Sequence, residues 1–283
     1  DTRARFLKDA WRVAATSDRI GLRLEGDPHP HGGASEILSD GMVPGSIQVP
    51  PDGRPIVMLA GIHPGCFELI GGRNVQTVRD LRNRTVAIAS EGSTQHAFLA
   101  AIAAQVGLHP KRDIKWVELP LDAQLRELAD GKVDAVMTFP PVGQEARAKK
   151  IGRVVVNSVV DKPWSQYFCC SVVANREFVR KHPVAAKRAT RAILKATDLC
   201  ASRPESSARY LVDKGFTANY EYALQTMKEI PYRSWREYNA EDSVRFWALR
   251  LHETGFVKTS PNKLAAEGTD WRFLNELKKE LKA

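Results

Sequence analysis

Apolar residues between positions 84 and 157 gather in short runs that alternate between strand and helix lengths. The first run, 86–89, leads through a Gly-Ser-Thr turn into a helix-length segment, 95–106. Further strand-length runs follow at 114–119, 131–139 and 154–156. This order predicts a β-α-β-α-β unit with a parallel sheet, because parallel strands are joined by crossovers that are usually helices.

Strand-like segments also flank this unit. Residues 56–61 form a continuous apolar run, which is typical of a buried strand. Residues 67–72 form a second short strand that ends in glycines, and residues 167–173 resume the strand pattern after the unit. We therefore expect the unit to be inserted between strands of another lobe.

The interrupted arrangement predicts an α/β protein with two lobes. Lobe 1 would comprise residues 1–76 and 165–283, and lobe 2 would comprise residues 77–164. Crossings near residues 70–77 and 160–167 would form a hinge. The remaining periodic segments predict a helical C-terminal extension at 176–201, 204–214, 218–229, 240–255 and 262–281.

The first 55 residues follow a different pattern. Residues 3–24 show some apolar periodicity and predict a helix, whereas residues 25–55 are rich in Gly and Pro and predict loops. The amino terminus lacks a basic, apolar and small-residue signal pattern. We expect either a cytoplasmic protein or one whose signal is not present in the printed sequence.

Composition is typical of a soluble globular protein, with 43% hydrophobic and 27% charged residues among 283. The net charge is +9, but basic residues are scattered and interleaved with acids, and no nucleic-acid-binding motif accompanies them. The charge therefore argues against a nucleic-acid partner and favours the attraction of small anions.

The turn before segment 95–106 is the first candidate binding feature. Gly92, Ser93 and Thr94 open a helix beyond the carboxyl end of a strand. Small ligands of open α/β sheets bind at that edge, and free N–H groups of a helix start favour anions. Ordinary capping of the helix by Ser93 is the alternative. Gln95 and His96 lie in the first turn and could reach the same cleft.

Aromatic and polar side chains near the hinge form a second candidate group. Trp164 and Tyr167 lie at the second crossing, where rings could stack on a flat ligand or pack the hinge. Thr138 and Phe139 end the strand-like run 131–139, so they also lie at a carboxyl edge. The nearby basic run of Arg147, Lys149 and Lys150 predicts a solvated helix end.

His63 and Cys66 could form a nucleophile pair or half of a metal site. The sequence shows no third group with suitable spacing, so we expect a tight turn, no metal, and a possible ligand contact by His63. Of the remaining cysteines, adjacent Cys169 and Cys170 should point to opposite faces of their strand. All four cysteines, including Cys200, are expected to be small buried hydrophobes.

Several segments resemble the substrate-binding proteins of ABC importers in the nitrate, sulfonate and taurine class, the NMT1/THI5-like group. The resemblance covers roughly residues 56–283. The segments that carry it are Val57–Gly61, His63–Leu69, Asp80–Arg82, Thr85–Ile88, Gly92–Thr94, Gly131–Ala135, Trp164–Cys170 and Gly268–Leu274.

The resemblance implies a bilobal type II periplasmic-binding-protein fold that closes on a solute and delivers it to an ABC permease. It also implies a monomer without cofactor or catalytic activity, held in the periplasm or anchored outside the cytoplasmic membrane. The ligand would contact Gly92, Ser93, Thr94, Gln95, His63, Trp164, Tyr167, Thr138 and Phe139. The solute would be anionic or heteroaromatic, with sulfonates, carboxylates, nitrate and pyrimidines all open.

Residues 1–55 depart from the family pattern, because they are too short and too rich in Gly and Pro for the usual start of the first lobe. Two alternatives share the broad fold. One is a THI5-like enzyme that makes the thiamine pyrimidine with iron, for which Cys169 and Cys170 supply only a pair. The other is the effector domain of a LysR-type regulator, which needs an N-terminal winged helix-turn-helix.

Overall fold

The computed structural model describes residues 12–13, 24–25 and 56–281. The chain divides into two compact units, residues 1–41 and 42–283. In the first unit, β1 (Arg12–Val13) pairs antiparallel with β2 (Leu24–Glu25). The helix predicted over 3–24 is therefore wrong at these positions, because their backbone groups pair across strands. The other residues of that prediction, and the loops predicted before residue 56, lie outside the described residues.

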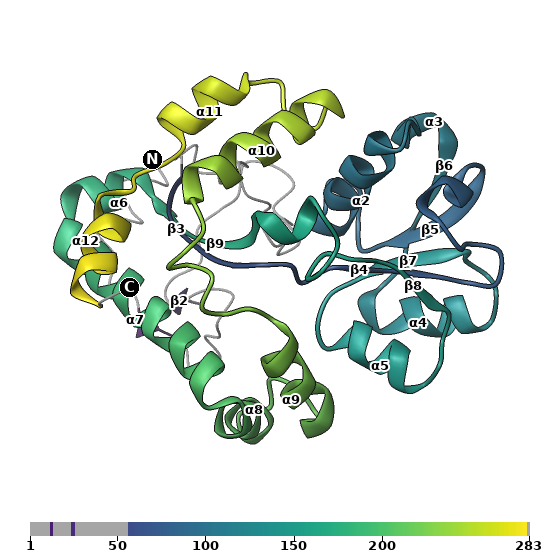
Figure 1. Ribbon diagram of the computed structural model, residues 1–283, viewed down its shortest axis with the longest axis horizontal. Helices are drawn as coiled ribbons and strands as arrows, with labels where there is room; N and C mark the ends of the chain where they lie inside the picture. The colour runs from purple at the N-terminus through teal and green to yellow at the C-terminus, as the bar shows by residue number, and fades with distance from the viewer. Residues whose placement is uncertain (1–11, 14–23, 26–55, 282–283) are drawn as a thin grey trace. The chain divides into compact units, whose positions relative to one another are not determined.

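The second unit contains a five-stranded mixed sheet with the order β6-β5-β7-β4-β8 (Figure 1). β5, β6 and β7 are parallel, as predicted, while β4 runs antiparallel between β7 and β8. The strands are β4 (Glu68–Gly71), β5 (Arg84–Ile88), β6 (Ile114–Glu118), β7 (Ala135–Thr138) and β8 (Arg153–Asn157). The position of β4 between β7 and β8 was not predicted, because an apolar pattern does not indicate which strands are neighbours.

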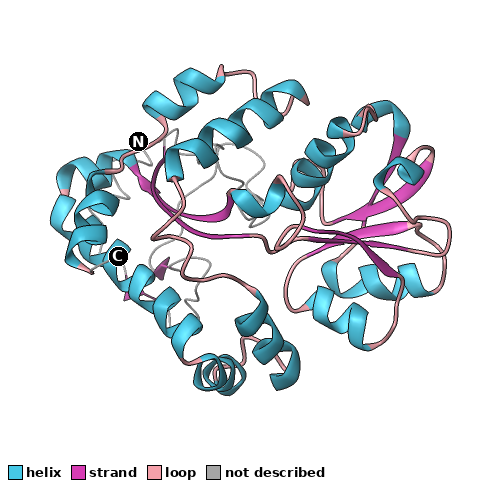
Figure 2. Ribbon diagram, viewed as in Figure 1, coloured by secondary structure: helices cyan, strands magenta, loops and turns pink. Residues whose placement is uncertain are grey.

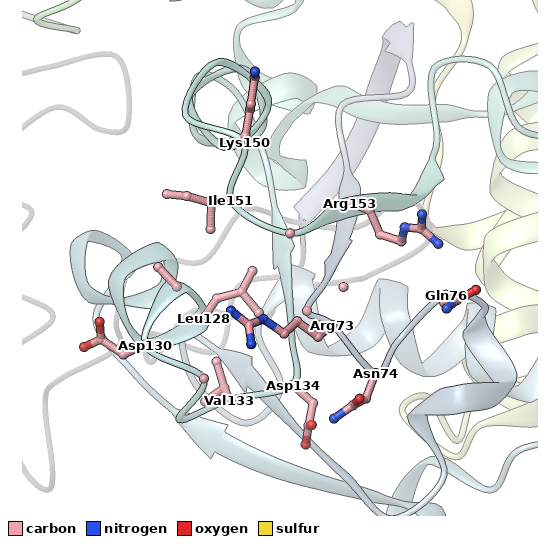
Figure 3. A pocket seen from close by; sticks show the side chains of 15 residues that line it. Arg73, Asn74, Gln76, Leu128, Asp130, Val133, Asp134, Lys150, Ile151 and Arg153 are labelled. Atoms are coloured by element: carbon pink, nitrogen blue, oxygen red, sulfur yellow. The ribbon is translucent and has the colours of Figure 1, made fainter.

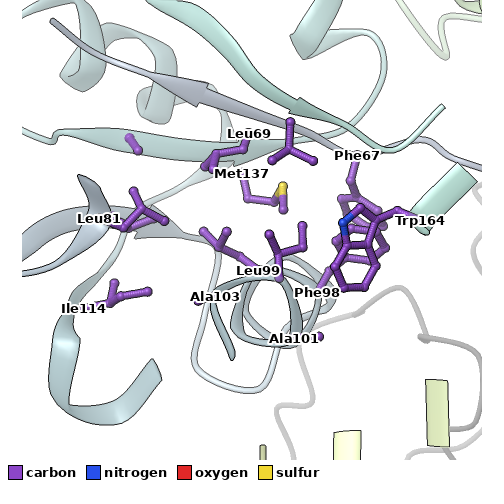
Figure 4. Close-up of a cluster of buried hydrophobic side chains, with 14 of the residues drawn as sticks. Phe67, Leu69, Leu81, Phe98, Leu99, Ala101, Ala103, Ile114, Met137 and Trp164 are labelled. Atoms are coloured by element: carbon purple, nitrogen blue, oxygen red, sulfur yellow. The ribbon is translucent and has the colours of Figure 1, made fainter. Parts of the chain in front are cut away.

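Helices cover both faces of this sheet. Side chains alternate along each strand, so that Leu69 and Met137 meet one face while Ile70 and Val136 meet the other. α2 packs on the first face, where its apolar residues join the largest core cluster (Figure 4). α4 and α5 pack on the second face. The helices are η1 (Val78–Leu81), α2 (Thr94–Gln105), α3 (Pro110–Asp113), α4 (Leu121–Ala129) and α5 (Val142–Ala148).

The other lobe is built on two long antiparallel strands, β3 (Ile56–Pro64) and β9 (Phe168–Asn175) (Figure 2). Their core side chains, among them Leu59 and Val172, pack with Trp235 and Leu277 from the C-terminal helices. These helices are α6 (Arg176–Lys181), α7 (Pro183–Ser202), α8 (Pro204–Asp213), α9 (Tyr220–Glu229), α10 (Ala240–Glu253), α11 (Pro261–Glu267) and α12 (Arg272–Glu280).

Local sequence sets the ends of several of these helices. The side chains of Asn175, Asn219 and Asn239 accept hydrogen bonds from the first backbone N–H groups of α6, α9 and α10. The predicted helix 176–201 is two helices, because Pro183 starts α7 directly after α6 ends. Pro261 similarly begins α11, and α12 follows as a separate helix.

Strand pairing refines the predicted lobes. The prediction assigned residues 67–72 to lobe 1, but β4 belongs to the five-stranded sheet of lobe 2. The turn predicted at 62–66 is likewise strand as far as Pro64. The two crossings between the lobes therefore run from Gly65 to Phe67 and from Ser158 to Tyr167. The exact lobe boundaries stay a prediction.

Gly65 lets the two crossings approach closely. Its φ is +61°, and an ideal Cβ there would lie 2.4 Å from the Val159 Cα and 2.5 Å from the Ser158 carbonyl oxygen. The Ser158 hydroxyl in turn accepts hydrogen bonds from the N–H groups of Cys66 and Phe67, at 3.1 and 2.8 Å. Only glycine meets both the conformational and the steric requirement.

We expect Gly65→Ala to lower the free energy of unfolding by about 3 kcal/mol, because overpacking against backbone adds to left-handed strain. Urea denaturation measures this loss. Gly131→Ala is the matched control, since Gly131 has a φ of +73° but nothing within 4 Å of its ideal Cβ. The control should lose only about 1 kcal/mol, and equal losses would contradict the role of close approach.

Candidate functional site at the hinge

The Gly-Ser-Thr turn opens a helix as predicted, but the amides of Gly92 and Ser93 are used within the chain. The Gly92 N–H donates to His96 Nδ1 at 3.0 Å, and the Ser93 N–H donates to the Ser90 carbonyl at 3.1 Å. Ser93 caps α2 through its hydroxyl, which accepts from the His96 N–H. The Glu91 N–H donates to the Glu118 carboxylate at 2.7 Å. In this conformation the turn therefore caps a helix, beside a carboxylate.

Gln95 and Thr138 are buried hydrogen-bonding residues. Gln95 accepts from the Ala89 N–H at 2.9 Å and donates to the Met137 carbonyl, which ties the ends of β5 and β7 together. Thr138 donates to the Glu68 carbonyl at 3.1 Å. Phe139 packs edge-on against Phe67, with ring centroids 6.3 Å apart. These contacts hold the sheet edge in place.

Trp164 and Tyr167 belong to an aromatic cluster between the lobes. Trp164 is buried against Phe98 from α2 and Trp247 from α10. Tyr167 stacks on Phe246 with ring centroids 3.8 Å apart, and it also lines a hollow of about 320 Å³ beside Tyr238. Hinge packing therefore accounts for Trp164, whereas Tyr167 keeps one face beside a cavity.

His96 joins the lobes on this same side. Its imidazole packs against Trp116 of β6 and Phe256, which follows α10, with centroids 4.5 and 4.9 Å apart. Burial lowers the pKa of His96. The ring therefore serves as a neutral acceptor for the Gly92 N–H and as a packing surface.

A sulfur-rich cluster lies where β3 and β9 leave lobe 1. Its four members are His63, Cys66, Cys169 and Cys170, and we call them the hinge thiol cluster. The Cys66 Sγ lies 3.0 Å from the Cys169 Sγ and 3.8 Å from the Cys170 Sγ. The Cys169 Sγ lies 3.7 Å from the Cys170 Sγ and 3.8 Å from the His63 Nδ1.

This cluster corrects two predictions. The sequence analysis found no third group near His63 and Cys66, yet Cys169 and Cys170 are there because β9 pairs with β3. Adjacent strand residues were also expected to face opposite ways, whereas both thiols converge. The strand register shifts on either side of His63, and such bulges redirect side chains.

Electrostatics within the cluster favour one ionised thiol. Hydrogen bonds from Cys169 and Cys66, together with the charge of His63, hold the pKa of Cys170 well below its usual range. Burial lowers the pKa of His63, but the facing Cys170 outweighs that effect and raises it overall. Tyr232 packs edge-on against the imidazole at 5.2 Å.

An ion-pair network joins the lobes next to this cluster (Figure 1). Arg147 on α5 contacts Glu68 of β4 and donates to both carboxylate oxygens of Glu229 on α9, at 2.7 and 2.6 Å. Gln144 also donates to Glu229 at 3.0 Å. Burial raises the pKa of Glu68, while Arg147 opposes this rise. Glu68 Oε2 and Gln144 Oε1 are buried without a hydrogen-bond partner among the described residues.

Sequence reasoning missed this network. Arg147 was predicted to lie in a solvated basic run with Lys149 and Lys150. The two lysines are exposed as predicted, and Lys149 pairs with Glu145 at 2.5 Å, but Arg147 is not. The prediction failed because Glu68 and Glu229 are 79 and 82 residues from Arg147 along the chain. The Phe67-Glu68-Leu69 segment could have indicated the network, because a carboxylate within a buried apolar strand needs a cationic or hydrogen-bonding partner.

A larger hollow, of about 750 Å³, lies at the opposite edge of the five-stranded sheet (Figure 3). Arg73, Asp134 and Arg153 are among the residues that line it, and Lys150 stands at its rim. This hollow is at the amino ends of β7 and β8, whereas ligands of such sheets bind at carboxyl ends. We therefore place the candidate site at the hinge.

Comparison with known families identifies this architecture. The sequence profile of the NMT1-like family matches residues 71–212, which is slightly more than half of the chain. The chain belongs to the NMT1-like family. This assignment confirms the resemblance found in the sequence.

Solved structures of other proteins share the fold of this NMT1-like protein. The periplasmic nitrate-binding protein NrtA from Synechocystis PCC 6803 is 13% identical, with a TM-score of 0.69 over 82% of this chain and 69% of that chain. The aliphatic sulphonate binding protein SsuA from Escherichia coli is 20% identical, with a TM-score of 0.58 over 72% and 66%. The desulfurization enzyme DSZB is 13% identical, with a TM-score of 0.56 over 80% of each chain. The predicted bilobal periplasmic-binding-protein fold is confirmed.

The amino-terminal part of the NMT1-like protein matches a different protein family. Residues 1–65 match the carboxyltransferase domain, subdomain A and B. Over 54 residues the chain is 39% identical to one of the subunits of 5-oxoprolinase from Escherichia coli strain K12, covering 19% of this chain and 17% of that protein. The chain thus spans less than a fifth of that relative's length.

No helix among the described residues of the NMT1-like protein has both the length and the apolar character needed to cross a membrane.

The ion-pair network predicts a pH-dependent stability. A carboxyl whose pKa is higher in the folded than in the unfolded protein stabilises below its ordinary pKa, and that contribution is lost as pH rises through the folded pKa. Arg147→Met removes the cation that opposes the raised pKa of Glu68. We expect little loss of unfolding free energy near about pH 4, growing to about 3 kcal/mol at neutral pH.

Urea denaturation across pH measures this effect, and Arg147→Met/Glu68→Gln is its control. The double variant has no carboxyl at position 68 to ionise, so the part of the loss that depends on Glu68 should disappear. A loss for Arg147→Met that is equal at acid and neutral pH would contradict the proposed coupling.

Proposed function

We propose that this NMT1-like protein is the solute-binding component of an ABC importer. It captures a small solute between its lobes outside the cytoplasmic membrane and hands it to a permease without catalysing a reaction. The observation that carries the proposal is the hinge. Two α/β lobes are joined by the crossings 65–67 and 158–167, and polar side chains from both lobes meet beside them.

Family and fold support this role. The NMT1-like profile covers most of the second lobe and the second crossing, and structures named as nitrate-binding and sulphonate-binding proteins share the fold. Lobe closure around a hinge is a common way for such proteins to enclose a ligand.

We infer that the solute would lie beside the hinge. Lobe 2 would contribute Glu68 and Gln144, and lobe 1 would contribute His63 and Tyr232. The hinge thiol cluster and the ion-pair network are linked along the chain, because Tyr232, which packs against His63, follows Glu229 by three positions. Of the sequence-predicted contacts, His63 and Phe139 remain suited to this cleft, and Gly92, Ser93 and Thr94 would act mainly by positioning α2.

Charge and hydrogen bonding favour the heteroaromatic class over the anionic one. Arg147 already pairs with two carboxylates, so its charge is not available to an anionic solute. Glu68 Oε2 and Gln144 Oε1 are buried acceptors that lack a donor in the part of the chain that the structure describes. A solute that carries N–H groups, such as a pyrimidine, would satisfy them, and an unsatisfied buried acceptor costs about 1–3 kcal/mol.

A thermal-shift panel tests both levels of the proposal. We expect pyrimidines and related N–H heterocycles to raise the melting temperature, because a ligand at 100-fold over its Kd adds about 2.7 kcal/mol. Nitrate, sulfonates and aromatic carboxylates should not. A shift with anions alone would overturn the solute class but keep the binding role, and no shift with any class of solute would count against the role itself.

Closure gives a separate prediction. Glu229→Gln removes the charge that lobe 1 contributes to the cross-lobe pair, so the closed state should be less populated. We expect solute affinity to fall about tenfold, which corresponds to about 1.4 kcal/mol, in isothermal titration of the solute found by the panel.

Glu205→Gln is the matched control. Glu205 pairs with Lys228 at 3.0 Å inside lobe 1, and its loss should leave solute affinity unchanged. Equal affinities for wild type and Glu229→Gln would show that the cross-lobe pair takes no part in closure.

A further inference from the structure

The hinge thiol cluster is more compact than packing requires. An imidazole nitrogen of His63 and the thiols of Cys169 and Cys170 all lie within 4.8 Å of one another. The thiol of Cys66 completes the group, at 3.0 and 3.8 Å from the two other sulfurs. Buried cysteines that serve only as small hydrophobes have no reason to converge with their sulfurs facing one another.

The spacing suits a single small cation. A tetrahedral zinc ion with Zn–S bonds of about 2.3 Å holds its sulfurs about 3.8 Å apart. Two of the three sulfur pairs are already at 3.8 and 3.7 Å. The third pair, Cys66 and Cys169, is at 3.0 Å and needs to open by less than an ångström.

The donor set selects the kind of ion. Three thiols and an imidazole suit thiophilic d10 ions such as Zn²⁺ and Cu⁺, whereas Mg²⁺ and Ca²⁺ prefer oxygen ligands. The Pro64 carbonyl lies 3.3 Å from the His63 Nδ1, and an Nδ1–H donated to it would orient the ring and leave Nε2 as the metal ligand.

The position of the cluster gives it a mechanical role. His63 belongs to β3, Cys66 to the first crossing, and Cys169 and Cys170 to β9. An ion bound here would link both connecting strands at the point where they leave lobe 1. Cys66 and Cys170 are only half-buried, so an ion can reach the site from the cleft.

We propose that His63, Cys66, Cys169 and Cys170 form a binding site for one thiophilic d10 metal ion, Zn²⁺ or Cu⁺. Binding releases the thiol protons to solvent and leaves the oxidation state of the ion unchanged. Binding of the ion does not require the solute, although His63 is shared with the proposed solute contacts, and the ion links β3 to β9.

The test uses the full chain, reduced and stripped of metal under anaerobic conditions. Competition with chromophoric chelators measures Zn²⁺ and Cu⁺ binding separately, and Co²⁺ serves as a spectroscopic probe. We expect one equivalent to bind, a thiolate-to-cobalt charge-transfer band, and protection of three of the four cysteines from alkylation. The thermal-shift panel without metal tests the solute separately.

Variants locate the site. Cys169→Ser and Cys170→Ser should each weaken binding by more than the roughly 10–100-fold that loss of an outer partner costs. Cys200→Ser is the matched control, because Cys200 is a half-buried cysteine on α7 outside the cluster. Circular dichroism melts establish that each variant is folded. If a β9 variant fails to fold, Cys66→Ser removes a ligand from the first crossing instead and should weaken binding in the same way.

Four outcomes would overturn the proposal. The first is no uptake of either ion by the reduced, folded chain. The second is a Cys66–Cys169 disulfide in air together with no uptake after reduction. The third is loss of binding in Cys200→Ser but not in the β9 variants, and the fourth is retention of iron in preference to Zn²⁺ or Cu⁺. The last result would instead revive the iron-enzyme alternative.

Discussion

The antiparallel pairing of β3 with β9 is the constraint on which the rest of this structure depends. It brings residues more than a hundred positions apart into contact, as with Cys66 and Cys169. It also sets both crossings side by side, where Gly65 fits beneath Val159 only because it has no side chain. The bulges next to His63 then turn both adjacent thiols of β9 toward the same space.

Lobe contact is divided between two chemically different surfaces. On one side of the hinge, rings from both lobes pack together, with Trp247 of α10 against Phe98 of α2. On the other side, Arg147 and Glu229 join α5 to α9 through charge. Apolar packing is insensitive to pH, whereas ion pairs compete with water and with ligands. The polar side is therefore the lobe contact that depends on pH.

The carboxyl-edge rule selects one end of the sheet, but it does not say which groups there are free to face a ligand. Gly92, Ser93 and Gln95 lie where the strand and helix pattern placed them, yet their hydrogen bonds are made within lobe 2. A backbone amide at a helix start binds an anion only if no internal acceptor is closer. That competition depends on Glu118 and His96, whose proximity is a property of the folded lobe.

Most of the elements, the family and the interruption of one lobe by another follow from the sequence, because hydrophobic periodicity and local turn chemistry are short-range properties. The sequence located α2, β5, β6 and β7 to within a few residues. Tertiary structure alone decided that β4 lies between β7 and β8, that Arg147 is held by two distant carboxylates, and that His63 meets three thiols. Each of these depends on strand order and register, which are set by long-range packing and have no signature in any single segment.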